Sequence, residues 1–400
     1  MISFAKGLPR VRAERRLVTS RVVGGAMSEN ELISDVTRVY DDYDWDTVKS
    51  FWSSIISADR PLPDFIKGNT TFGIPNIQQL TEMGELSGEF SSNEPRFNDK
   101  KTYAIRIGYN GCYYEYGFQR QRVKYPEIEV QTVELDIKEA LGLNCQITTA
   151  GRTDKYVSAV SQVVTIVTSV DVTPAEILRR GRESKAARSG RLVFYDCARA
   201  PRAFNARSSA TWRRYLYLVP LENTSEHVGN VDPTAVNRIL GHLEGHELPY
   251  NAFAFGEQRD KGHGLEDKCT MYLSRAYEVA IPLYAEDGTQ ENDAVGMARA
   301  LCIELVGTRF LRRMVRLLVA TAVEEAQKSE EVRDEGVLKA ICLSGDRSLR
   351  ARPFPGLGLA FAGCGFDYRS MAYYKFISKV KRAMLDEEFR RRDEDATAQQ

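Results

Sequence analysis

The sequence lacks the features of a membrane-spanning, disulfide-bonded or cysteine-rich zinc protein. It contains no apolar run close to the roughly 20 residues that a membrane-spanning helix needs, so we expect no membrane insertion. Its seven cysteines are scattered, and no Cys-x-x-Cys pair occurs among them. This spacing argues against a disulfide framework and against a cysteine-rich zinc site, and it favours a reducing compartment.

Net charge is also absent. The 400 residues include 55 basic and 55 acidic side chains, which gives a formal net charge of zero. Any nucleic-acid binding must therefore rest on a local basic patch rather than on overall charge. The apolar and charged fractions are those of a soluble globular protein, and the length suffices for one large core or two of ordinary size.

The first 98 residues differ in composition from the rest of the chain. Residues 1–26 carry six basic side chains against one acid, Glu14, a bias typical of a mitochondrial presequence. A basic arm that touches RNA in the cytoplasm or nucleus is the alternative. Helices are predicted at 28–39 and 45–56, and a Pro-, Gly-, Asn- and Ser-rich surface segment at 60–98. We interpret residues 1–98 as an accessory extension.

From residue 102 onward, strand and helix patterns alternate, which is typical of an α+β or split βαβ arrangement. Alternating or β-branched segments predict strands at 102–109, 162–170, 213–220, 271–283, 300–307 and 357–368. Apolar periodicity and caps predict helices at 129–142, from 174, from 232, at 310–327 and at 329–343. The predicted units are an N-terminal half at 99–215, a C-terminal half at 216–376 and a charged tail at 377–400.

A tight polar turn precedes the β-branched strand at 162–170 and presents one carboxylate, Asp154. Gly151 permits the turn because a residue without Cβ can adopt positive φ. Arg152 lies two residues before the acid, and a neighbouring cation keeps a carboxylate ionised. A capped surface turn with an ordinary ion pair is the alternative interpretation.

Two further segments concentrate positive charge. Residues 178–214 hold eleven basic side chains against Glu183 and Asp196, interleaved with aromatic residues, as phosphate contact and base stacking require. A solvated charged face is the alternative. In the predicted helix at 310–327, the cations Arg312, Arg313 and Arg316 lie in the first half, where they oppose the helix dipole. We therefore expect a carboxylate or a phosphate to compensate them.

Together these segments resemble the TruA-type tRNA pseudouridine synthases, and most closely their eukaryotic Pus3-like branch, from about residue 101 to 370. The blocks that carry the resemblance are Tyr109-Asn110-Gly111 with Gln119-Arg120-Gln121, the turn Gly151-Arg152-Thr153-Asp154-Lys155-Tyr156-Val157-Ser158-Ala159, Ala206-Arg207-Ser208 with Arg213-Arg214-Tyr215-Leu216-Tyr217, Gly307-Thr308-Arg309-Phe310-Leu311-Arg312-Arg313-Met314-Val315-Arg316, and Pro355-Gly356-Leu357-Gly358-Leu359. A further family turn is only partly kept around Glu244-Gly245-His246 and Asn251-Ala252-Phe253.

The resemblance implies two RRM-like, ferredoxin-like halves whose antiparallel sheets face a central basic cleft. It implies isomerisation of uridine to pseudouridine in tRNA or rRNA, without metal or organic cofactor. It assigns the catalytic acid to Asp154, the base-stacking ring to Tyr215 and the cation that pairs with the acid to Arg316. The side chains it implies for RNA contact are Arg152, Lys155, Gln119, Gln121, Arg207, Arg213, Arg214, Arg312 and Arg313. Partners besides RNA would be a second copy of the chain or ribosome-assembly proteins.

The turn departs from the family at one position, where Tyr156 replaces a glycine. If this position requires positive φ, tyrosine strains the turn by about 1–3 kcal/mol, and its ring could occupy the uridine site. This departure keeps a second function open: a catalytically inactive RNA-binding protein on the same scaffold, such as a mitochondrial rRNA-binding assembly factor.

Overall fold

The computed structural model describes residues 43–57, 60–69, 71–86, 100–119, 130–221, 231–256, 268–284 and 294–366. The predicted presequence, the predicted helix at 28–39 and the charged tail at 377–400 lie outside these ranges. Within them, none of the helices has the length and hydropathy needed to cross a bilayer.

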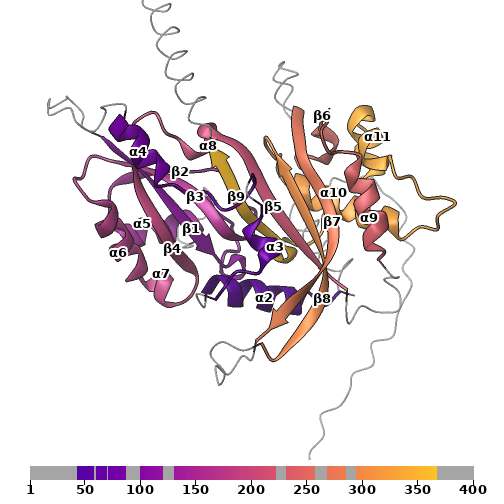
Figure 1. The fold of residues 1–400 in the computed structure, drawn as a ribbon, viewed down its shortest axis with the longest axis horizontal. Coiled ribbons are helices and arrows are strands. Elements are labelled where there is room, and N and C mark those ends of the chain that lie inside the picture. Colours follow the sequence, from indigo (N-terminus) through magenta and orange to yellow (C-terminus); the bar gives the residue numbers. More distant parts are fainter. Residues whose placement is uncertain are drawn as a thin grey trace, which may run out of the picture.

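The described residues build one large, mostly antiparallel sheet, which confirms the predicted α+β class (Figure 1). Its strand order is β4-β1-β3-β9-β5-β8-β7-β6, and β2 pairs with β3 outside this path. The strands are β1 (Lys101–Tyr109), β2 (Cys145–Thr149), β3 (Ser158–Thr168), β4 (Leu192–Ala200), β5 (Ala210–Pro220), β6 (Glu247–Pro249), β7 (Lys268–Leu283), β8 (Gly296–Gly307) and β9 (Leu359–Phe366).

The last strand, β9, lies in the middle of this sheet and makes it continuous. It pairs in parallel with β3, where Ser158 lies opposite Ala360. It pairs antiparallel with β5, where Tyr215 lies opposite Phe361. The predicted boundary at residues 215 and 216 falls within β5, and the division into two halves stays a prediction.

Most helices pack with one face of the sheet in a single apolar core, to which α5, α6, α9, α10 and α11 contribute buried side chains. The helices are α5 (Val133–Leu141), α6 (Pro174–Arg182), α7 (Lys185–Arg188), α8 (Ala206–Ser209), α9 (Pro233–Gly241), α10 (Met314–Ala326) and α11 (Val337–Ser344). Local signals determine two of the starts. Thr173 caps α6 by accepting the Glu176 N–H at 3.2 Å, and Asp232 caps α9 by accepting the Thr234 N–H at 2.8 Å.

The N-terminal extension contributes a second apolar core. Its α2 (Trp45–Ser57) buries Phe51 and Trp52 against sheet residues that include Leu216 and Ala360. Next along the chain come α3 (Asp64–Lys67) and α4 (Gln79–Leu86), and Leu80 of α4 belongs to the first core. Residues 45–86 are therefore structural parts of the folded unit, and α2 covers sheet residues that would otherwise be exposed.

Four predicted segments differ from the structure. The helix expected from residue 310 begins at Met314, because Arg313 before it has a left-handed backbone, φ 61°. The segment 329–343 becomes helical at Val337. The structure adds two strands that the residue patterns do not predict, β2 and β4. Polar and charged residues interrupt the apolar pattern of both.

Candidate active site

Asp154 lies in a reverse turn that leads directly into β3. The Val157 N–H donates to the Asp154 carbonyl at 3.3 Å and closes the turn. Tyr156, at the third position, has φ 62°, the conformation that a type II turn requires there and that glycine adopts most readily. The Tyr156 ring lies near the Lys155 ammonium, 5.3 Å from the ring centroid. This position does require positive φ, and tyrosine adopts it.

Hydrogen bonds to neighbouring elements hold the turn from several sides. The Tyr109 hydroxyl, at the end of β1, is 2.8 Å from Thr153 Oγ1. Gln162 of β3 donates to the Gly151 carbonyl at 2.7 Å. The Tyr156 N–H donates to the Tyr114 carbonyl at 3.2 Å. The backbone beside Asp154 is therefore fixed before any substrate arrives.

Three glycines let other loops approach this turn closely. A Cβ at Gly111 would lie 2.5 Å from the Tyr156 carbonyl oxygen, and one at Gly356 would lie 2.4 Å from that of Lys155. A Cβ at Gly117 would lie 2.6 Å from the Thr153 carbonyl oxygen. These distances are below any that real Cβ atoms occupy, so the motif glycines at 111 and 356 are needed for packing around Asp154.

Arg316 comes from the first turn of α10 and meets Asp154 from the other half of the sequence. Its Nη1 lies 3.8 Å from Asp154 Oδ2, and the arginine side chain is 7% exposed against 26% for the aspartate. Its Nε donates to the Phe354 carbonyl at 2.5 Å, which fixes the orientation of the guanidinium. Burial lowers the pKa of Arg316, and the Asp154 carboxylate opposes that shift. The anion expected near this helix start is Asp154.

Tyr215 of β5 forms an aromatic wall beside the same turn. Its ring makes edge contacts with Phe310 and Phe361, at centroid distances of 4.9 and 5.2 Å. A Cβ placed on Gly151 would lie 3.1 Å from the Tyr215 hydroxyl. The Tyr215 side chain therefore packs closely against the turn that holds Asp154. Burial raises the pKa of Tyr215, and the charges of Tyr109 and Asp154 act in the same direction. The structure thus brings Asp154, Tyr215 and Arg316 together.

Several predicted RNA contacts surround this centre. Arg152 and Arg207 are exposed. The pKa of Arg152 is lowered, mainly by its partial burial and secondly by the positive charge of the nearby Arg207. Gln119 is exposed, whereas Gln121 lies outside the described residues. Lys155 and Arg313 are half-buried, and Arg312 is exposed at the start of α10.

Two predicted RNA contacts are wrong because their guanidinium groups are engaged inside the protein. Arg214 is fully buried, pairs with Glu304 at 2.5 Å and donates to the carbonyls of Phe65 and Ile66, each at 2.6 Å. Arg213 donates to four backbone carbonyls, those of Ala150, Arg207, Ala210 and Thr308. Both residues connect elements of the scaffold and cannot reach a phosphate.

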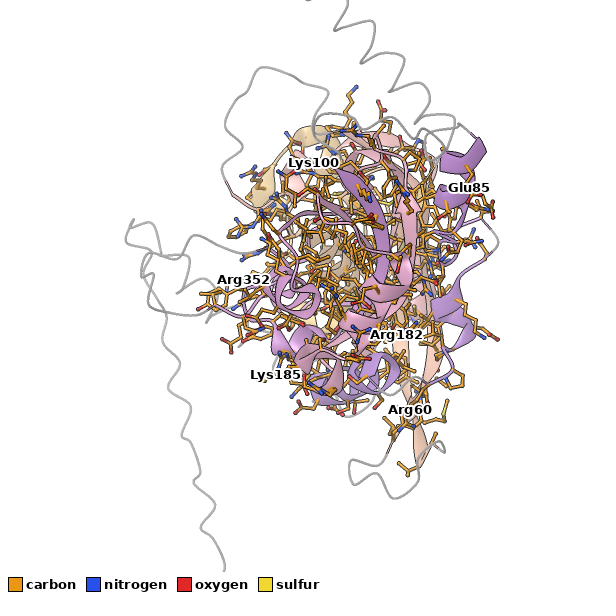
Figure 2. All side chains as sticks on the ribbon, turned by 90° about the vertical axis from the view of Figure 1, so that its left-hand side faces the viewer. Arg60, Glu85, Lys100, Arg182, Lys185 and Arg352 are labelled. Atoms are coloured by element: carbon orange, nitrogen blue, oxygen red, sulfur yellow. The ribbon has the colours of Figure 1, made fainter. Side chains whose placement is uncertain are left out.

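Several cations of the basic run at 178–214 are engaged within the protein. Arg179 and Arg180 pair with Glu176, and Arg179 also with Glu183. Arg182, on the side of the molecule shown in Figure 2, donates to backbone carbonyls of β4. RNA contact by this segment stays a prediction, and Arg179, Arg180 and Arg182 are held by contacts within the protein.

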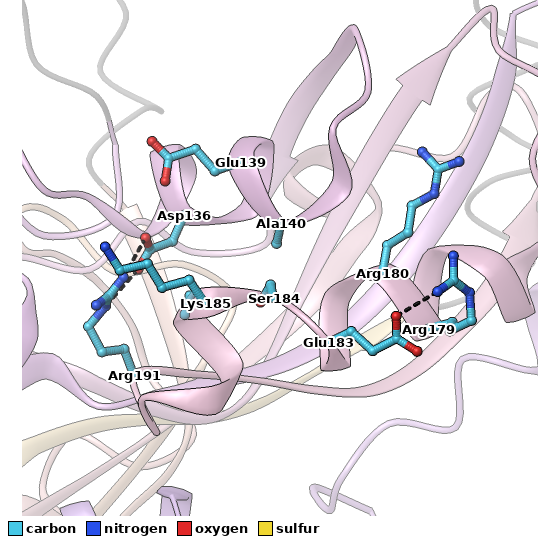
Figure 3. A pocket seen from close by; sticks show the side chains of 10 residues that line it. Asp136, Glu139, Ala140, Arg179, Arg180, Glu183, Ser184, Lys185 and Arg191 are labelled. Carbon is cyan, nitrogen blue, oxygen red and sulfur yellow. Dashed lines mark hydrogen bonds and ion pairs between the residues drawn. The ribbon is translucent and has the colours of Figure 1, made fainter.

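A cavity of about 270 Å³ lies in this region, between α5 and the helices α6 and α7 (Figure 3). Arg191 and Asp136 form one of its ion pairs at 3.1 Å, and the Tyr114 hydroxyl donates to the same carboxylate at 2.7 Å. Neither Asp154 nor Arg316 is among its lining residues. The cavity is therefore separate from the Asp154 centre. Tyr114 links the two, because its hydroxyl bonds Asp136 and its carbonyl accepts the Tyr156 N–H.

Residue patterns alone did not identify several parts of the site. Tyr109 lies in one of the sequence blocks that carry the resemblance. Its hydrogen bond to Thr153, however, forms only because β1 and the turn are adjacent in space. Gln162 read as an ordinary strand residue, although a buried amide within an apolar strand is a usable signal for a hydrogen-bonded role. Phe361 comes from β9, whose position between β3 and β5 no local pattern predicts.

Bacterial proteins named tRNA pseudouridine synthase A match most of the chain. The relative from Chlorobaculum tepidum is 29% identical over 273 residues, which cover 65% of this chain and 96% of the relative. Those from Listeria monocytogenes and Brachyspira hyodysenteriae are 26% and 27% identical, with 64% of this chain and 96% and 95% of the relative covered. The chain is similar to bacterial proteins named tRNA pseudouridine synthase A.

This similarity supports the TruA-type resemblance, and the activity that the relatives' names state, pseudouridine synthesis, is an isomerase activity. No protein-family model matches the chain. Among solved structures, a Cbf5-Nop10-Gar1 complex aligns with 63% of this chain and 70% of its own chain at 13% identity. Its TM-score of 0.21 is too low to carry a structural argument.

Proposed function

We propose that the chain isomerises uridine to pseudouridine in structured RNA, with Asp154 as the catalytic carboxylate. The observation that carries this proposal is the meeting of three side chains from separate elements: Asp154 before β3, Arg316 on α10, 3.8 Å from it, and Tyr215 on β5. A charged acid held by a buried guanidinium, beside an aromatic face, is what a flipped pyrimidine nucleotide needs.

The reaction breaks the bond between C1′ and N1 of uridine, turns the base and forms a bond from C1′ to C5. The C5 proton then leaves and N1 gains a proton, so atoms and electrons balance. Asp154 acts either by attack on C1′ or by removing a proton from C2′. Arg316 orients the carboxylate in both cases, and Tyr215 supports the base once it has left the stack.

Substitution of Asp154 tests this proposal because the reaction releases the C5 hydrogen. RNA carrying C5-tritiated uridine gives a direct readout as released tritium. For Asp154→Asn we expect a loss of at least about three orders of magnitude in kcat, with RNA affinity retained. Asp171→Asn, which makes the same change at an exposed site paired with Lys101, should retain activity. Binding without tritium release by the unaltered protein would support the inactive RNA-binding function instead.

The finer assignments are also proposals. We propose that the substrate is a folded tRNA or rRNA, that the chain falls in the Pus3-like branch, and that residues 1–26 direct it to mitochondria. The motif blocks support the branch, and the basic, acid-poor composition supports the location. Imaging of the tagged protein with and without residues 1–26 tests the location, and a cytoplasmic or nuclear signal contradicts it. Sedimentation tests a homodimer.

A further inference from the structure

Additional cations surround the Asp154–Arg316 pair at the start of α10. Lys155 follows Asp154 in the turn, and Arg313 precedes Arg316 by three residues, so the 3.8 Å contact between Asp154 and Arg316 brings both cations to the same region. Burial, Arg316 and Arg313 lower the pKa of Lys155, in that order, which agrees with this proximity. Glu115 is the carboxylate that opposes the shift.

Arg313 is held in a defined position rather than extended into solvent. Its guanidinium carbon lies 3.7 Å from the centroid of the Phe255 ring, a close cation–π contact. The Phe255 N–H donates to the Arg312 carbonyl at 3.0 Å, and Arg350 donates to the Ala254 carbonyl at 3.0 Å. The aromatic support beneath the guanidinium is therefore itself fixed by backbone hydrogen bonds.

The backbone of Arg313 is also unusual. It has φ 61°, a left-handed conformation that is unfavourable for a residue with a Cβ. Such strain persists when the surrounding structure enforces it, and it concentrates at functional sites. Glycine would satisfy the same geometry without strain but would lack the guanidinium.

We propose that Arg313, supported by Phe255, and Lys155 bind a backbone phosphate next to the target uridine and so place its ribose against Asp154. A planar guanidinium presents N–H donors along its edges, which suits phosphate oxygens. Lys155, Arg313 and Arg316 place three cations beside Asp154, and such a concentration of positive charge favours a polyanionic ligand. This inference rests on the proposed function and names the part of the RNA that the site holds.

Arg313→Gly separates the side chain from the backbone. Because glycine readily adopts positive φ, the variant should fold and melt at or above the temperature of the unaltered protein. With C5-tritiated tRNA we expect KM to rise about 10- to 100-fold, with a smaller change in kcat. The slope of log kcat/KM against log salt should become shallower by about 0.7 to 0.9. Arg313→Lys should restore the slope, and Arg309→Gln, a charge loss four residues earlier, should leave KM within about twofold.

Failure of this inference can be told apart from failure of the proposed function. If Arg313→Gly leaves KM and the salt slope unchanged, or if Arg309→Gln changes them equally, the specific phosphate contact is overturned. If the unaltered protein releases no tritium, the proposed function fails. The phosphate contact is then tested by tRNA affinity, measured by filter binding for Asp154→Asn with and without Arg313→Gly. A loss of affinity of about tenfold or more on adding Arg313→Gly supports the contact, and equal affinity overturns it.

Discussion

Tyr156 has a backbone conformation that glycine adopts most readily, two residues after Asp154, the proposed catalytic acid. Its φ of 62° costs a tyrosine about 1–2 kcal/mol relative to a right-handed conformation. Burial and a hydrogen bond with Glu115 raise the pKa of its hydroxyl, so the ring is tied to the neighbouring loop. The turn thus keeps its geometry despite the substitution, and strain alone gives no reason to deny the protein activity.

Tyr156→Gly should therefore retain pseudouridine formation. Relief of the left-handed strain stabilises the variant, whereas the greater freedom of glycine in the unfolded chain costs about 0.4–1 kcal/mol. We expect the free energy of unfolding to stay within about 1 kcal/mol and kcat within about threefold. Urea unfolding and tritium release measure the two quantities. A large loss of kcat with intact stability would assign the ring a direct role in the reaction.

The Tyr109 hydroxyl has a different role, because it is buried and forms a hydrogen bond with Thr153 of the turn. Tyr109→Phe removes its bond to Thr153 and should cost about 0.5–1.5 kcal/mol of stability. We expect kcat to fall about tenfold with KM unchanged, because the acid is less well placed. Tyr103→Phe is the matched control on the same strand: it removes a hydroxyl that donates to the Val172 carbonyl at 2.5 Å. An equal fall in kcat for both variants would contradict a positioning role.

At the level of elements, prediction succeeded where the signal is local. The starts of α6 and α9 follow from Thr173-Pro174 and Asp232-Pro233, since a cap acts on its own helix. The start of α10 was placed too early because apolar periodicity continues through Leu311, and a left-handed Arg313 leaves no trace in that pattern. The burial of Arg214 was missed for a related reason: its partner Glu304 lies on β8, ninety residues away.

Arg214 connects β5 to α3 through its hydrogen bonds, and its substitution tests the importance of this connection. Arg214→Met should destabilise the protein by about 3–5 kcal/mol, because Glu304 is left nearly buried without its cation. The double variant Arg214→Met with Glu304→Leu should regain part of that loss, since it removes the uncompensated charge. Urea unfolding of the three variants measures this. Equal stability of the single variant and the unaltered protein would show that the ion pair contributes little.

At the scale of the whole molecule, the sequence predicted the α+β class and the residues that meet at the site, but not the continuity of the sheet. The resemblance brought Asp154 and Arg316 together on motif order alone, and the structure places them 3.8 Å apart. The integration of α2 was not predicted, since an amphipathic helix is compatible with many partners. Which surface it covers depends on strand order, and strand order is a property of long-range pairing.

Buried thiols make stability sensitive to alkaline pH. Burial raises the pKa of Cys197, Cys302, Cys342 and Cys364 from about 9 to about 12. The unfolded chain therefore loses these protons near pH 9, whereas the folded protein retains them. Their contribution is fully present below pH 9 and is lost as the pH rises from 9 towards 12. We expect the melting temperature to fall steadily above pH 9, and a constant value up to pH 11 would contradict this burial.

The central position of β9 affects how the sheet and the site assemble during folding. Residues 359–366 follow both β3 and β5 in the sequence, yet they lie between these two strands and supply the Phe361 ring against Tyr215. Without β9, β5 has a partner strand on one edge only, and Ser158 and Ala159 of β3 lack their backbone partners. The centre around Asp154 is therefore complete only once β9 has docked between β3 and β5, so assembly of the site depends on closure of the whole sheet.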